Sequence, residues 1–408
     1  MTASSPLYLY DDAQARGFEP FALTRPVSEL RAGTELLRRR WEIALGTSAA
    51  GTIAAPHLAD FTEDGAPRAA QGTIPAGAVV AQSRFAPALG SVRRGGVANV
   101  WTNGGRVAAL RLESAISVEA FGAGGVALDT LRPATGSMVE IAGHWIDDVW
   151  QFIAHLLPML RADIEAIGPG LSCAPIEHAT VIGPHAVYVE RGATVEPLVV
   201  IDATNGPVAV MAGATVRAFT RLVGPCYIGA NTQILGDRVH GCAIGEMSVI
   251  KGEISETIVT GHANKGHEGF VGHSILGRWV NLGAGTITSN LKNTYGSVSL
   301  WTPNGERDTG LVKLGTMFGD HVKTGIGTRF NTGSVVGAGS NVYGSAAIPR
   351  RVPAFSWGDG ASLTEYKIEQ FLNATERAMG RRQIALGEAA RRQLRAAHAL
   401  ARAAAARG

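Results

Sequence analysis

Histidines and carboxylates are the side chains of this sequence best suited to take part in a reaction. His262 and His267 lie five residues apart, and His240 precedes them. Imidazole titrates near neutral pH, so it can take a proton from an amine, and three histidines can also hold a zinc ion that keeps an open position. Asp11 and Asp12 follow a short apolar run, and carboxylates of this kind can bind Mg²⁺. General-base, zinc and magnesium chemistry all remain open on these residues alone.

A six-residue repeat dominates the second half of the chain. A helix has a period of about 3.6 residues and a lone strand a period of about 2, so neither explains this spacing. Hexapeptide repeats are typical of a left-handed parallel β-helix, in which short strands wind into a triangular coil around aliphatic side chains. The aliphatic residues that recur every six positions are Val189, Val195 and Ile201; Val210, Val216, Leu222, Ile228 and Ile234; Ile244 and Ile250; Leu276 and Leu282; and Val336, Val342 and Ile348.

Breaks in the repeat predict segments that leave the coil. The period is lost in residues 202–209, 252–275 and 287–313. Insertions in repeat proteins often lie on one binding face. We therefore expect the segment that carries His267 to leave the wall of the coil and to meet substrate.

The predicted fold class is mixed, with an α/β domain followed by a β-helix and a short helical tail. Residues 1–142 are expected to form a small α/β domain, and residues 143–170 a connecting helix. The β-helix is expected over residues 171–355 and the helical tail over residues 356–408. Within the tail, Ser362–Glu365 has the sequence of a helix-capping box.

Composition excludes several classes of function. The 408 residues carry 37 basic and 34 acidic side chains, a formal charge of +3, so no strong field favours nucleic acid. No apolar stretch approaches the roughly 18 residues of a membrane span, and the first residues do not resemble a leader peptide. The three cysteines form no CxxC pair. We therefore expect a cytoplasmic protein without nucleic-acid or membrane partners.

Two segments carry a resemblance to a known family. Residues 264–272 read NKGHEGFVG and residues 281–290 read NLGAGTITSN. Both resemble the acetyltransferase half of the bifunctional UDP-N-acetylglucosamine pyrophosphorylase / glucosamine-1-phosphate N-acetyltransferase family, the GlmU-like family. Residues 23–31 (LTRPVSELR), 289–293 (SNLKN) and 355–358 (FSWG) are similar to a shorter bacterial branch of sugar nucleotidyltransferases. The resemblance covers nearly the whole chain and is more specific in the second half.

The resemblance implies acetyl transfer from acetyl-CoA to an amino-sugar 1-phosphate in the β-helix, and a homotrimer. In this family a histidine at the position of His267 is the general base that deprotonates the attacking amine. Lysine and amide side chains suit such a substrate because they offer donors to its oxygens. The positions that correspond to family binding residues are Lys251 for the phosphate, Asn281 and Asn290 for the sugar, and Ala284 and Asp320 for acetyl-CoA.

The resemblance also implies nucleotidyl transfer to a sugar 1-phosphate in the first domain, from an NTP that we expect to be UTP. The usual glycine-rich phosphate loop is missing after residues 7–10. Arg25 is expected to contact the nucleotide phosphates instead, and Asp11 or Asp12 to hold Mg²⁺. In the alternative interpretation the two aspartates cap a turn and Arg25 forms a salt bridge.

Two other functions fit the same repeats. One is a zinc enzyme similar to the γ-class carbonic anhydrases, with His262, His267 and His240 as ligands. The other is a non-catalytic trimeric scaffold that binds a nucleotide sugar, which the fold alone cannot separate from an enzyme. Metal analysis distinguishes the first from acetyl transfer, and coenzyme A binding distinguishes the second.

Overall fold

The computed structural model describes residues 5–90, 98–133, 136–344 and 347–406. The chain forms two compact units, each of which draws on more than one segment. The first unit comprises Met1–Phe18, Ala22–Val149 and Gly387–Leu400. The second unit comprises Glu19–Phe21, Trp150–Leu386 and Ala401–Gly408.

The first unit is built on a six-stranded mixed sheet with the strand order β11-β8-β9-β6-β1-β4. Strand β1, next to the edge strand β4, runs parallel to both β4 and β6, whereas β9 runs antiparallel to β6 and β8. The strands of this sheet are β1 (Leu7–Tyr10), β4 (Ala49–Ile53), β6 (Val79–Gln82), β8 (Val100–Asn103), β9 (Arg106–Arg111) and β11 (Met138–Glu140). Short pairs surround it, namely β2 (Arg31–Ala32) with β3 (Glu35–Leu36), β5 (Thr73–Ile74) with β10 (Ile116–Ser117), and β7 (Phe85–Pro87) with β12 (Gly143–Trp145).

Both faces of this sheet are covered, because the side chains of β1 alternate between two hydrophobic clusters. Leu7 and Leu9 lie in one cluster with Trp41 of helix α1 (Leu37–Leu45). Tyr10 lies in the other cluster with Phe121, and their ring centroids are 4.9 Å apart. The expected α/β layer structure is thus present in the first unit.

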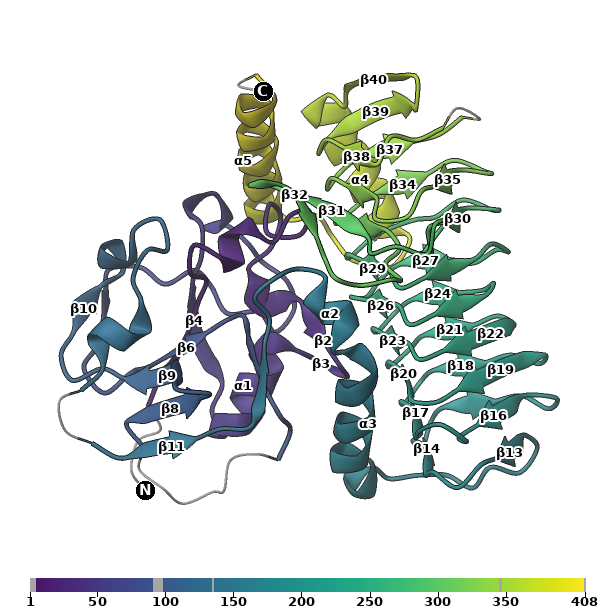
Figure 1. Ribbon diagram of the computed structural model, residues 1–408, viewed down its shortest axis with the longest axis horizontal. Coiled ribbons are helices and arrows are strands. Elements are labelled where there is room, and N and C mark those ends of the chain that lie inside the picture. The colour runs from purple at the N-terminus through teal and green to yellow at the C-terminus, as the bar shows by residue number, and fades with distance from the viewer. Residues whose placement is uncertain (1–4, 91–97, 134–135, 345–346, 407–408) are drawn as a thin grey trace. The chain divides into compact units, whose positions relative to one another are not determined.

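The second unit is the predicted left-handed β-helix, whose strands form three faces (Figure 1). Strands stack in parallel from coil to coil on every face, and the terminal pair β39–β40 is antiparallel. The first face consists of β13 (Thr180–Ile182), β16 (Val200–Asp202), β19 (Thr220–Val223), β22 (Asp237–His240), β25 (Ile254–Ser255) and β28 (Val271–Gly272). The second face consists of β14 (Val187–Val189), β17 (Val208–Val210), β20 (Cys226–Ile228), β23 (Ala243–Ile244), β26 (Ile258–Val259), β29 (Ile275–Leu276), β33 (Met317–Phe318), β36 (Val335–Val336) and β38 (Arg351–Val352).

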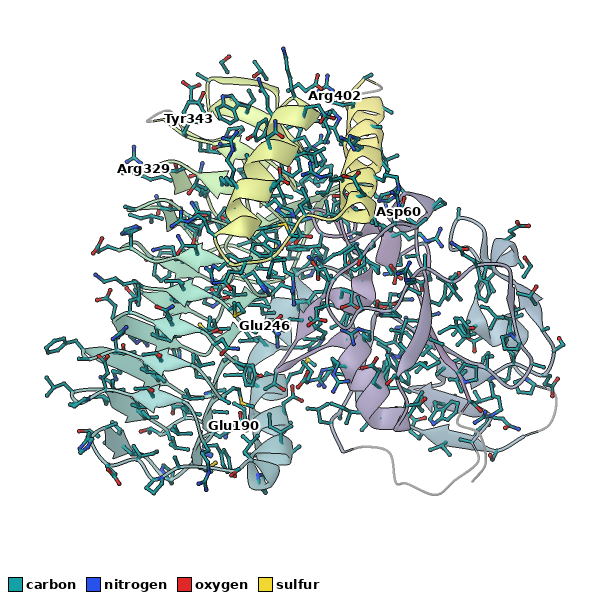
Figure 2. All side chains as sticks on the ribbon, turned by 180° about the vertical axis from the view of Figure 1, so that it is seen from behind. Asp60, Glu190, Glu246, Arg329, Tyr343 and Arg402 are labelled. Carbon is teal, nitrogen blue, oxygen red and sulfur yellow. The ribbon has the colours of Figure 1, made fainter. Side chains whose placement is uncertain are left out.

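The third face has two parts joined through Asn281. Asn281 bridges to Asn264 on one side and to Lys323 on the other, so the coil continues without a gap in the ladder. The strands of this face are β15 (Thr194–Val195), β18 (Thr215–Val216), β21 (Gln233–Ile234), β24 (Val249–Ile250) and β27 (Asn264–Lys265), then β34 (Lys323–Thr324), β37 (Asn341–Val342), β39 (Ser356–Asp359) and β40 (Ser362–Glu365). Figure 2 shows Glu190 on an early coil, Glu246 on a middle one and Tyr343 on a late one.

Most of the aliphatic residues of the hexapeptide repeat fill the inside of the coil. Val210, Ile228 and Ile244 lie directly above one another on the second face and have no exposed surface. Removal of this apolar surface from water provides the main driving force for coiling.

The structure corrects the predicted break at residues 252–275. This segment contains β25, β26, β27 and β28, and all four pair in parallel with the preceding coil. The aliphatic period is lost for two reasons. Lys265 takes the inward position of β27, and the coil that joins Ile250 to Lys265 is shorter than three hexapeptides. Of the segment 287–313, β30 (Ile287–Thr288) stays in the coil with β35 (Arg329–Phe330), and the hairpin of β31 (Ser299–Thr302) and β32 (Gly305–Asp308) forms the excursion.

The ends of the β-helix also differ from the predicted boundaries. The proposed connecting helix begins with strand β12 and then forms α2 (Gln151–Ala154) and α3 (Leu156–Ile167). Helix α3 lies along the second face (Figure 1). The predicted capping box is strand β40 instead, because its backbone pairs with β39, and helix α4 (Ile368–Gly380) begins after it. The last helix is α5 (Glu388–Ala405), and no helix of the described residues is long and apolar enough to cross a membrane.

Truncation of one inward side chain tests the packing of the coil. Ile244→Ala should lower the free energy of unfolding by about 2–5 kcal/mol, because it leaves a cavity between Ile228 and Val259. Val312, which is 49% exposed, provides the control, and Val312→Ala should change stability by less than about 0.5 kcal/mol. Chemical denaturation followed by circular dichroism measures both, and equal effects would contradict the inward placement of Ile244.

Candidate active sites

The corner between the third and first faces brings several predicted residues together. We call it the histidine corner and define it as residues 251–252, 266–269 and 283–286. These segments belong to successive coils, and backbone hydrogen bonds join them. The Lys251 amide donates to the Lys265 carbonyl at 2.7 Å, and the Gly285 amide donates to the Glu268 carbonyl at 3.0 Å. The structure therefore places Lys251, His267 and Ala284 on one edge of the coil.

His267 is the exposed residue of this corner that can accept a proton. Glu268 next to it forms an ion pair with Lys251, at 3.0 Å from Nζ to Oε1. The hydrogen bond from Lys251 to Glu268 raises the pKa of the lysine, so this side chain is cationic at neutral pH. Because the pair is solvent-exposed, it contributes little to stability and can open for an incoming phosphate.

Asn281 lies beside the histidine corner on the third face. Its Oδ1 accepts a hydrogen bond of 2.8 Å from Asn264 Nδ2. The next residue of the same ladder is Lys323, and burial lowers the pKa of its ammonium to about 8. Asn264, Asn281 and Lys323 thus form a polar row, which Asn341 continues in the next coil.

Asn290 belongs to a different cluster. Its amide Nδ2 donates to Nδ1 of His273 at 2.9 Å, and Nε2 of the same ring faces Glu256 at 3.4 Å. Burial, with further contributions from Lys313 and His240, lowers the pKa of His273 to about 4, so the ring is neutral at pH 7. No hydrogen bond among the described residues joins Asn290 to Asn281. The two amides that we predicted to bind the sugar therefore have different hydrogen-bond partners within one chain.

Asp320 and the zinc hypothesis fit the structure poorly. The buried carboxylate of Asp320 accepts a hydrogen bond of 2.8 Å from the Arg278 amide and thereby holds a turn of the coil. We therefore leave it out of the proposed acetyl-CoA site. The ring of His262 packs against Trp279 at 4.6 Å, and the described residues contain no group of three histidine, cysteine or acidic side chains that could hold a metal ion.

In the first unit, Arg25 is part of the core. It is 2% exposed, and its guanidinium forms two hydrogen bonds to the Glu63 carboxylate, at 2.8 and 3.1 Å. Asp11 is also buried, and its Oδ2 accepts a hydrogen bond of 3.0 Å from the Val27 amide. The contacts of Arg25 agree with the alternative interpretation from the sequence, in which Arg25 forms a salt bridge.

The two aspartates do not fit a resident Mg²⁺. Burial raises the pKa of Asp11 to about 6, and its carboxylate has partners in the protein interior. Asp12 Oδ1 caps a turn by accepting from the Ala15 amide at 2.9 Å, and both of its oxygens bind Arg84 at 2.8–3.0 Å. A metal ion at Asp12 would have to displace this guanidinium.

A pocket of about 260 Å³ opens beside Asp12, at the carboxyl ends of strands β1 and β6. This end of parallel strands is where α/β sheets usually bind ligands. Arg84 and Arg106 line it together with Trp145, and the guanidinium of Arg106 lies 3.8 Å above the indole ring. Asp147 accepts from both arginines and holds them in place.

Glycine backbone forms the opposite wall of this pocket. The Gly124 carbonyl accepts a hydrogen bond of 2.8 Å from the Ala13 amide. A Cβ atom on Gly124 would lie 2.6 Å from that nitrogen, and its φ is +91°, so only glycine fits. Gly125 continues the wall. Glycine is therefore required at position 124 because the backbone of Asp12 and Ala13 passes close to it.

Sequence reasoning missed Arg84, Arg106 and Trp145. The signal for Arg84 was present, because it lies three residues after the apolar run 79–81 and polar residues after a buried strand often line a site. Arg106 and Trp145 had no such signal, because their contact depends on the pairing of strands far apart in the sequence.

Comparisons with known proteins agree with the two-part organisation. Residues 7–170 match the sugar nucleotidyl transferase family model. The bifunctional sugar-1-phosphate nucleotidylyltransferase/acetyltransferase of Sulfurisphaera tokodaii is 32% identical over 100 residues, which cover 24% of this chain and 25% of that protein. The bifunctional protein GlmU of Methanococcus aeolicus is 27% identical over 274 residues, or 61% of this chain and 58% of that protein.

A hexapeptide transferase family protein from Anaplasma phagocytophilum is similar at 14% identity and a TM-score of 0.28, over 56% of this chain and 99% of that one. A TM-score this low carries no argument about function. Fold and family match together define a chain with a sugar nucleotidyl transferase domain and a hexapeptide β-helix. The chain is similar to several proteins named GlmU, and it spans less than two thirds of the length of the relatives named above.

Proposed function

We propose that the protein is a sugar-nucleotide biosynthesis enzyme with two transferase activities. The second unit acetylates the amine of an amino-sugar 1-phosphate, such as glucosamine 1-phosphate, with acetyl-CoA. The first unit transfers a nucleotidyl group from an NTP to a sugar 1-phosphate. The observation that carries the proposal is the histidine corner, where an exposed histidine lies between a cationic lysine and the turn 283–286.

Acetyl transfer needs a neutral amine, because an ammonium has no lone pair with which to attack a thioester. In the proposed step, His267 takes the amine proton as the nitrogen bonds to the acetyl carbon. The carbon–sulfur bond then breaks, and coenzyme A leaves as a thiol after it receives a proton. Lys251 binds the sugar phosphate, Asn281 and Asn290 bind the sugar, and the thioester lies near Ala284. Asn290 can join the site only if it is supplied by a neighbouring chain or released from His273.

Nucleotidyl transfer is supported by the family match and by the pocket beside Asp12. A phosphate oxygen of the sugar 1-phosphate attacks the α-phosphorus of the NTP, and pyrophosphate leaves. Arg84 and Arg106 supply the planar cationic donors that suit phosphate oxygens. The indole of Trp145 is held against both arginines and offers a face on which a base or sugar can stack.

Replacement of the proposed base tests the acetyltransferase assignment. His267→Ala should lower kcat by about 10²–10⁴-fold, while KM for acetyl-CoA changes little because the base acts on the amine. Thiol release from acetyl-CoA with a panel of amino-sugar 1-phosphates measures both.

Two histidine variants serve as controls for that experiment. His178 is exposed and remote from the histidine corner, so His178→Ala should leave the rate unchanged. His262→Ala should be mild. A normal kcat in His267→Ala would refute the assignment, and stoichiometric zinc with an equal loss in His262→Ala would restore the zinc hypothesis. No acetyl transfer together with tight binding of a nucleotide sugar would favour the scaffold hypothesis.

Pyrophosphate release tests the first unit. Arg106→Gln should lower the rate roughly tenfold or more through a higher KM for the NTP, because a charged hydrogen bond to phosphate is lost. Arg111 provides the control, since it lies on the same strand β9 but binds the Gly77 carbonyl outside the pocket. Arg111→Gln should stay close to wild type. If no pairing of UTP or another NTP with a sugar 1-phosphate releases pyrophosphate, nucleotidyl transfer in this unit is wrong.

We also propose that the chain forms a homotrimer through the coil. Large apolar side chains are exposed at turns between the third and first faces, among them Phe219 at 77% and Ile326 at 82%. Exposed apolar side chains on one edge of the coil suit contact with a partner chain. Light scattering at micromolar concentration should give three times the mass of one chain, and a monomer would contradict the proposal.

A further inference from the structure

Lys265 occupies a position that is aliphatic in the neighbouring coils. On the third face, Val216, Ile234 and Ile250 lie above one another with their side chains inside the coil, and Lys265 is the next residue of this column. Leu282 follows in the next coil and is fully buried. Lys265 itself has 0% exposed surface. A charged group inside such a core is costly unless every donor has a partner.

The ammonium of Lys265 has a partner for each of its three N–H donors. Nζ donates to the carbonyl of Lys251 at 3.2 Å, to the carbonyl of Glu268 at 3.1 Å, and to the carbonyl of His267. A lysine has three donors and no acceptor, so its capacity is fully used. One buried ammonium thus joins the backbone of the His267 segment to that of Lys251.

The surrounding backbone leaves room for this arrangement. A Cβ atom on Gly252 would lie 2.6 Å from the Gly269 carbonyl oxygen, 3.1 Å from the His267 carbonyl oxygen and 3.2 Å from Lys265 Nζ. Glycine is therefore required at position 252, where the His267 carbonyl turns toward the ammonium of Lys265. The Glu268 carbonyl also accepts from the Gly285 amide, so the same network reaches the turn 283–286.

Stability alone does not explain a lysine here. The column already contains aliphatic residues that remove apolar surface from water, and a hydrophobic side chain in place of a buried charge is often neutral or stabilising. Burial lowers the pKa of the Lys265 ammonium to about 8, opposed by the charges of Glu268 and Asp237 and assisted by that of Lys251. The group is still mostly protonated at pH 7, so all three donors are available.

We propose that Lys265 is a positioning residue, which fixes the backbone of the His267 segment relative to Lys251 and to the turn 283–286 from inside the coil. This inference rests on the proposed function of His267 as the general base. Misplacement of a catalytic group by about 1 Å can cost a factor of about 10² in rate, so loss of this anchor should affect kcat more than the binding of acetyl-CoA.

The test uses Lys265→Met and Lys265→Gln in the full-length protein. Methionine fits the aliphatic column but offers no donor, whereas glutamine retains two of the three. We expect kcat for acetyl transfer to fall about 10- to 100-fold in Lys265→Met and less in Lys265→Gln, with KM for acetyl-CoA nearly unchanged. The melting temperature should follow the opposite order, with Lys265→Met equal to or above wild type.

Hydrogen exchange provides a readout that does not depend on activity. The Gly285 amide should exchange at least about tenfold faster in Lys265→Met, because its acceptor on Glu268 is no longer held. Lys323→Met is the matched control: this lysine also has a pKa lowered to about 8, but its Nζ contacts the His321 carbonyl at 3.4 Å. Exchange at Gly285 should be unchanged in this variant.

The outcomes separate this inference from the proposed function. Faster exchange at Gly285 with a lower kcat supports the inference. Unchanged exchange, or faster exchange with a normal kcat, overturns it and leaves the acetyltransferase proposal in place. A lower melting temperature in Lys265→Met that accounts for the lost activity also overturns it, because the lysine would then be structural. If the wild type transfers no acetyl group, the proposed function and the catalytic part of this inference fail together, and the exchange experiment still decides whether Lys265 holds the corner.

Discussion

The parallel register between successive coils is the constraint on which the second unit depends. Each inward residue lies directly above its counterpart in the next coil, as Ile244 lies above Ile228 on the second face. The hydrogen-bond ladder and the packing of the coil interior fix this register together, since a shift by one residue would turn the aliphatic side chains outward. Residues separated by a full coil become neighbours as a result. The histidine corner exists because Lys251, Glu268 and Gly285 are stacked in this way.

The two units place charge in opposite ways. In the first unit the charged groups of the pocket bind one another, and Asp147 is shared between Arg84 and Arg106. In the proposed nucleotidyl transfer, a phosphate would compete with that carboxylate for the two guanidinium groups. In the histidine corner the charges are exposed except for the ammonium of Lys265, which is satisfied by carbonyls. The exposed side chains of this corner therefore lie beside a buried polar anchor.

Local sequence predicted the structure well where each coil has the same type of residue at the same position. It predicted poorly where a residue of another type occupies that position. The hexapeptide period predicted the β-helix because every coil needs an aliphatic residue at the same inward point. It failed over residues 252–275 because the coil keeps its register there with shorter corners and an inward lysine. The capping box at Ser362–Glu365 failed for a related reason: pairing with β39 satisfies the same backbone groups that a helix would have satisfied.

The sequence by itself determined the β-helix, the α/β character of the first unit, the family resemblance and the exposed His267 with Lys251 and Ala284 nearby. These features depend on spacing along the chain or on the stacking of adjacent coils. Only the tertiary structure decided that Arg25 binds Glu63 in the core, that Arg84 and Arg106 line the pocket, and that Lys265 points inward. The physical reason is that the partner of a charged side chain is chosen by burial and distance in space, and neither can be read from the neighbours of that residue in sequence.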